Sequence, residues 1–152
     1  MRLTPNIACS TTGANSTNPD FGYSGNWFDP GKGGQGLVFE LNPAAGVVFF
    51  AWYTYAPNGV AQGAAGQRWY TGQANFSPGM RTLQTTVYET TGGMFNSAAP
   101  APHTDAVGTA TITFTSCAAA TLAYNLTGGS SAGSSATINL SRVGPTPAGC
   151  GP

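Results

Sequence analysis

The feature that most constrains the fold is a succession of short β-type runs, each bounded by glycine, proline or asparagine. Residues 109–115 alternate threonine with the apolar side chains of Ala110, Ile112 and Phe114. A period of two is typical of a strand with one buried face. Similar runs recur along the chain without a convincing helical pattern. We therefore predict strands at residues 26–28, 37–41, 47–55, 67–73, 82–90, 109–115, 121–127 and 136–143.

The alternation also predicts which side chains are buried. The last three runs each carry an apolar face, so we expect them to share one antiparallel sheet. Residues 47–55 are apolar on both faces, which places this strand centrally or gives it a second covered surface. The predicted core includes Phe49, Phe114, Leu122 and Ile138.

Eight short antiparallel strands predict an all-β domain, either an up-and-down barrel or a two-sheet sandwich, and we favour the barrel. A chain of 152 residues has room for one such domain. We place the β-domain at residues 23–144. The segments on either side, 1–22 and 145–152, are predicted to be a leader and a C-terminal tail.

Charge excludes several partners. Only 7% of the residues are charged, and five Lys and Arg balance five Asp and Glu. Such a chain lacks the positive electrostatic potential that would hold a polyphosphate, so we expect no nucleic-acid partner. The longest apolar run, around residues 46–52, is far shorter than the ~20 residues of a membrane-spanning helix, and we expect no membrane insertion.

The three cysteines favour an oxidising compartment. One bridge plus one free thiol is the simplest arrangement in an exported protein, and we favour Cys117 with Cys150, leaving Cys9 in the leader. Unpaired cysteines in a reducing compartment are the alternative. Their wide spacing and the single histidine argue against a metal site, and we expect no cofactor.

The stretch SGNWFDPGKGGQGLVFE, residues 24–40, raises the question of a ligand-cradling loop. A phosphate cradle needs its glycines to lead into a helix N-terminus. Here they lead into the apolar run 37–41, which reads as a strand. Asp29, Pro30 and Gly31 have the chemistry of a turn, so the stretch predicts a glycine-rich hairpin.

Several short motifs lie along the predicted strands and turns: GNWFDP at 25–30, GQG at 34–36, AWYTY at 51–55, RW at 68–69, TGGMF at 91–95 and VGTATITF at 107–114. With this pattern, residues 23–143 resemble a β-rich module of unknown function found in exported proteins of Gram-negative bacteria. The resemblance implies an exported, extracellular or cell-surface β-domain. Its motif positions carry the fold, so it implies no catalytic residue. Residues 60–66 depart from the pattern because they form a longer link between two aromatic strands.

Exposed aromatics are the best functional signal. Adjacent aromatics on a strand point to opposite faces, so some rings among the pairs at 27–28, 52–53 and 69–70 must lie outside the core. Aromatic rings beside amides suit a neutral ligand, above all a carbohydrate. The alternative is that the second ring of each pair only caps a sheet edge. The predicted ligand-binding residues are Trp27, Gln35, Gln67, Trp69, Tyr70 and Gln73.

Two further functions stay open. A low-charge surface with threonine-rich strands suits a structural subunit that binds copies of itself in an extracellular fibre or surface layer. Glu40 and Glu89 would be the carboxylates of a glycoside hydrolase if they met. No serine or cysteine stands in a nucleophile turn, and His103 is expected in a solvated loop. We therefore expect a non-catalytic protein.

Overall fold

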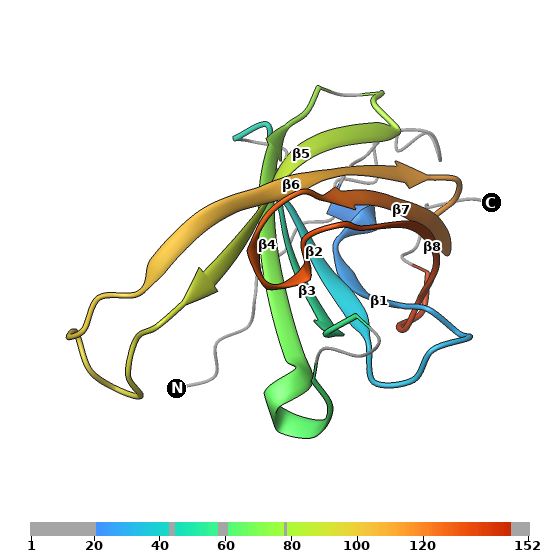
Figure 1. Ribbon diagram of the computed structural model, residues 1–152. Coiled ribbons are helices and arrows are strands. Elements are labelled where there is room, and N and C mark those ends of the chain that lie inside the picture. The colour runs from blue at the N-terminus through green and yellow to red at the C-terminus, as the bar shows by residue number, and fades with distance from the viewer. Residues whose placement is uncertain (1–20, 43–44, 58–60, 78, 147–152) are drawn as a thin grey trace, which may run out of the picture.

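The eight strands close into a single antiparallel barrel in which each strand pairs with the next in sequence and the last pairs with the first (Figure 1). The structure is a computed structural model that describes residues 21–42, 45–57, 61–77 and 79–146. The predicted all-β up-and-down barrel is therefore confirmed. Most of the predicted leader and tail lies outside the described residues.

Each strand overlaps one of the predicted runs, although several begin earlier or end at a different residue. The strands are β1 (Gly25–Phe28), β2 (Gly36–Asn42), β3 (Val47–Tyr55), β4 (Gln67–Asn75), β5 (Thr82–Thr91), β6 (His103–Phe114), β7 (Ala119–Leu126) and β8 (Ser134–Arg142). Within the described residues, the helical segments are three 3₁₀ turns: η1 (Phe21–Tyr23), η2 (Gly63–Gly66) and η3 (Gly129–Ser131).

The β5–β6 hairpin is much longer than expected and extends beyond the barrel wall (Figure 1). β6 begins at His103 and not at residue 109, because His103 pairs with Thr91 at the far end of the ladder. The register shifts between Val87 and Tyr88. A bulge bends and twists a strand, and this one lies close to the point where the hairpin leaves the barrel (Figure 1).

The barrel interior is a solid core. An eight-stranded barrel is just wide enough for side chains to fill it. The Phe39 ring packs against Phe114 and Phe50, with centroid distances of 5.4 and 6.2 Å respectively. Phe114 and Leu122 are buried as predicted, and Ile138 is partly buried against the same cluster.

The prediction that Phe49 lies in the core is wrong. Phe49 is 42% exposed, and its neighbour Phe50 is the buried ring. Phe50 lies opposite Phe39 of β2, so the inward face of β3 is the one that meets the inward face of β2. The other apolar face of β3 points outward.

The seam between β1 and β8 is the shortest ladder, with the pairs Trp27–Arg142 and Phe28–Ser141. Arg142 supports this seam by donating hydrogen bonds to the backbone carbonyls of Gly22, Ser24 and Cys117. Its guanidinium also lies 5.0 Å from the ring centroid of Trp27. Burial lowers the pKa of Arg142 from its ordinary value, yet a guanidinium stays charged at neutral pH.

Candidate functional site

The barrel mouth is closed by its own loops. Glu89, on the inner face of β5, accepts hydrogen bonds from the backbone N–H (2.8 Å) and the hydroxyl of Ser130. Tyr70 donates its hydroxyl to Ser131 Oγ at 2.7 Å. These bonds hold the β7–β8 loop over the mouth, so the interior has no open entrance at this point.

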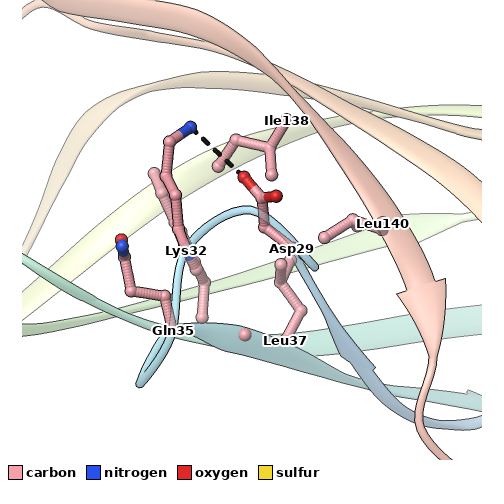
Figure 2. Close-up of a pocket in the computed structure, with 8 residues that line it drawn as sticks. Asp29, Lys32, Gln35, Leu37, Ile138 and Leu140 are labelled. Atoms are coloured by element: carbon pink, nitrogen blue, oxygen red, sulfur yellow. Dashed lines mark ion pairs between the residues drawn. The ribbon is translucent and has the colours of Figure 1, made fainter.

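A small pocket lies beside this mouth, between the β1–β2 loop and β8 (Figure 2). It holds about 10 Å³, which is room for one water molecule. The Lys32 Nζ and Asp29 Oδ2 atoms form an ion pair 3.2 Å long at its rim (Figure 2). The Gly31 N–H and then Lys32 hold the pKa of Asp29 below its ordinary value. The pocket is too small for an organic ligand.

The outer face of β3, β4 and β5 is the best candidate for a binding site. It carries a group of exposed aromatic rings, here called the aromatic platform. Trp69 is the most exposed of them, at 54%. The members of the platform are Phe49, Tyr53, Tyr55, Trp69 and Tyr88.

The strand register sets the arrangement of the platform. Tyr53 of β3 lies directly opposite Trp69 of β4, so two large exposed residues occupy neighbouring positions on the outer face. Directly opposite side chains on one sheet face have Cβ atoms about 5 Å apart. In the next outward row Ala51 lies opposite Thr71, and Thr71 in turn lies opposite Tyr88 of β5. Ala51 and Thr71 have smaller side chains than the aromatic residues of the neighbouring rows, so the platform is lower at these two positions.

Amides flank the rings on the same face. Gln67 lies opposite Tyr55, and Gln73 lies opposite Phe49. Both glutamines are exposed. Three of the residues predicted to bind a ligand, Gln67, Trp69 and Gln73, are thus brought together on the outer face of β4.

The other three predicted residues lie elsewhere. Trp27 and Tyr70 are each 1% exposed and belong to the core, because their strand positions face inward. Gln35 is half-buried at the barrel mouth, where its Oε1 accepts a 2.5 Å hydrogen bond from Thr54 Oγ1. These three side chains do not contribute to the aromatic platform.

Sequence reasoning missed four platform rings as binding residues: Phe49, Tyr53, Tyr55 and Tyr88. The signal that finds them is β4, in which residues 67, 69, 71 and 73 are polar or amphipathic and residues 70 and 72 are Tyr and Gly. Once this parity fixes the outer face of β4, the antiparallel register assigns Tyr53 to the same face.

The candidate catalytic groups are not assembled into a site. Glu40 is exposed on the outer face of β2, whereas Glu89 is buried on the inner face of β5, so the barrel wall separates them. His103 Nε2 lies 2.9 Å from Asp105 Oδ1 on the exposed start of β6. No group of three or more His, Cys, Asp or Glu residues suited to a metal ion occurs in the described part of the chain.

Cys117 is a buried residue of the β6–β7 turn, whereas Cys9 and Cys150 lie outside the described residues. The bond between Cys117 and Cys150 therefore stays a prediction. Across residues 21–146, apart from the gaps already named, no helix has the length and hydrophobicity of a membrane span. Comparison with protein-family models, with curated proteins and with solved structures finds no significant match to this chain.

Proposed function

We propose that this chain is an exported, non-catalytic binding module that holds a neutral carbohydrate on its aromatic platform. The observation that carries the proposal is the exposed pair of Tyr53 and Trp69 with Gln67 and Gln73 on the same face. Aromatic faces stack on the apolar faces of sugar rings, while amides bind the hydroxyl groups.

The shape of the platform favours an extended glycan. The outer wall of a barrel is convex, so it cannot surround a monosaccharide as a pocket does. The interior is closed to such a ligand by Glu89, Ser130 and the rest of the filled core. A chain of several sugar units can instead lie across the rows of rings and gain affinity with each unit it adds.

Trp69→Ala tests the proposal. We expect the variant to lose binding on an array of neutral oligosaccharides and polysaccharides while its melting temperature stays close to that of the wild type, because an exposed ring contributes little to the core. Met80→Ala is the matched control, since Met80 is an exposed apolar side chain outside the platform. The absence of any glycan signal from folded wild-type protein would remove carbohydrate as the ligand.

Export also predicts the redox state of the cysteines. In an oxidising compartment we expect Cys117 and Cys150 to be joined and one thiol to remain free. Mass spectrometry of the native exported protein after alkylation checks this number. Three alkylated cysteines would argue against both the bridge and the proposed compartment.

A further inference from the structure

The part of the β5–β6 hairpin that projects from the barrel, residues 90–106, is here called the arm (Figure 1). Every residue from 91 to 106 is exposed. At its tip Met94 is 63% exposed and Phe95 is 99% exposed. Met94 and Phe95 are adjacent large apolar side chains, so together they form an exposed patch that is a candidate contact surface for a partner.

The arm holds its tip in a defined conformation. The hydroxyl groups of Thr90 and Thr104 are 2.9 Å apart across the ladder. Ser97 N–H donates to the carbonyl of Met94 at 3.2 Å, and Asn96 takes a left-handed conformation with φ of 52°. Asparagine tolerates this conformation better than most residues, so the turn presents Phe95 at its corner. A tip ordered in advance loses little conformational entropy on binding.

The charges of the arm narrow the choice of partner. Residues 90–106 contain no Lys or Arg, and their acidic side chain, Asp105, lies beside His103. Attraction to an anionic lipid surface needs cationic side chains beside the apolar anchor. An uncharged aromatic surface is a better match for this tip.

The chain itself carries such a surface. We infer that the Met94–Phe95 tip of one molecule docks on the aromatic platform of a second copy, beside Trp69 and Tyr53. Ring–ring contacts between Phe95 and these side chains would replace the water that now covers them. The two copies do not repel each other at long range, because the formal net charge is zero.

The contact is heterologous, because the tip and the platform are different surfaces of the molecule. Such head-to-tail contacts build open chains or rings, in contrast to symmetric dimers. The inference gives a physical basis to self-assembly, which the sequence left open as an alternative function, and it does not rest on carbohydrate binding.

Sedimentation velocity of the full chain over a rising concentration series tests the inference. We expect wild-type protein to associate and Phe95→Ser to weaken that association by about tenfold or more. Met80→Ser is the matched control, because Met80 is an exposed apolar side chain in the β4–β5 loop at the opposite end of the barrel. Wild-type protein that stays monomeric at all concentrations would overturn the inference.

A mixing experiment identifies the two surfaces. Phe95→Ser keeps an intact platform and Trp69→Ser keeps an intact tip, so each variant alone should be monomeric while their mixture forms a one-to-one dimer. A mixture that stays monomeric would overturn the inference, as would Phe95-dependent binding of monomers to neutral phosphatidylcholine vesicles. Because glycan binding is measured separately, either proposal can fail without the other.

Discussion

Trp52 and Tyr53 are neighbours in β3, and Tyr70 and Trp69 are neighbours in β4, yet each pair is divided by the barrel wall. Inside, the Trp52 and Tyr70 rings lie 5.2 Å apart between centroids, and Tyr124 lies 4.9 Å from Trp52. Outside, Tyr53 and Trp69 occupy opposite positions on neighbouring strands and are 45% and 54% exposed. The comparison teaches that residue type does not determine the role of a ring in this barrel, whereas strand parity does.

Truncating one ring on each side of the wall is the strongest test of this comparison. We expect Trp52→Ala to lower the free energy of unfolding by about 3–5 kcal/mol, because it leaves a cavity between Tyr70 and Tyr124. Tyr53→Ala should change it by no more than about 0.5 kcal/mol, as is usual for exposed side chains. Urea unfolding of both variants measures the difference, and equal losses would show that the outer rings also belong to a packed layer.

Adding a methyl group to the inner face compares the two sides of the barrel wall again, with a smaller expected loss of stability. A Cβ on Gly72 would collide with the ring of Phe50 and meet Thr85 Oγ1 at 2.9 Å. We expect Gly72→Ala to cost about 1–3 kcal/mol through overpacking. The control is Thr71→Ala on the outer face, which should be close to neutral. A neutral Gly72→Ala in thermal melts would mean that the Phe50 ring has room to move.

The sequence predicted the fold best where one strand face is clearly polar. The threonines of residues 109–115 identify Ile112 and Phe114 as core residues, and both are buried. Residues 47–55 are apolar on both faces and carry no such information, so the prediction chose Phe49 in place of Phe50. Only the register with Phe39 of β2 resolves that choice.

Two other differences also have local causes. Ala136 belongs to the apolar face expected for the last predicted run but is exposed, because β1 pairs with β8 only at Ser141 and Arg142 and leaves this part of β8 at the rim. The start of β6 was assigned to a loop because residues 103–106 are exposed on both faces and show no alternation of apolar and polar side chains. Their strand conformation comes from cross-strand pairing alone.

The sequence predicted only some of the residues that make up the aromatic platform. The abundance of aromatics and amides indicated a neutral binding surface, and Gln67, Trp69 and Gln73 do lie on one face. Trp27 and Tyr70 were misplaced because an aromatic pair on a strand does not reveal which member faces inward. The exposed tip at Phe95 was not identified because its motif reads only as a turn.

The short β1–β8 seam has a consequence for the order of folding. Every other ladder joins strands that are consecutive in sequence, and hairpins of this kind close small loops of chain. The Arg142 bond to Ser24 joins residues 118 positions apart. The entropy of loop closure rises with the length of the loop, and contacts distant in sequence slow folding. The barrel therefore consists of local hairpins closed by one pairing of distant strands. We expect this β1–β8 pairing to have the largest loop-closure entropy of the eight ladders and to form last.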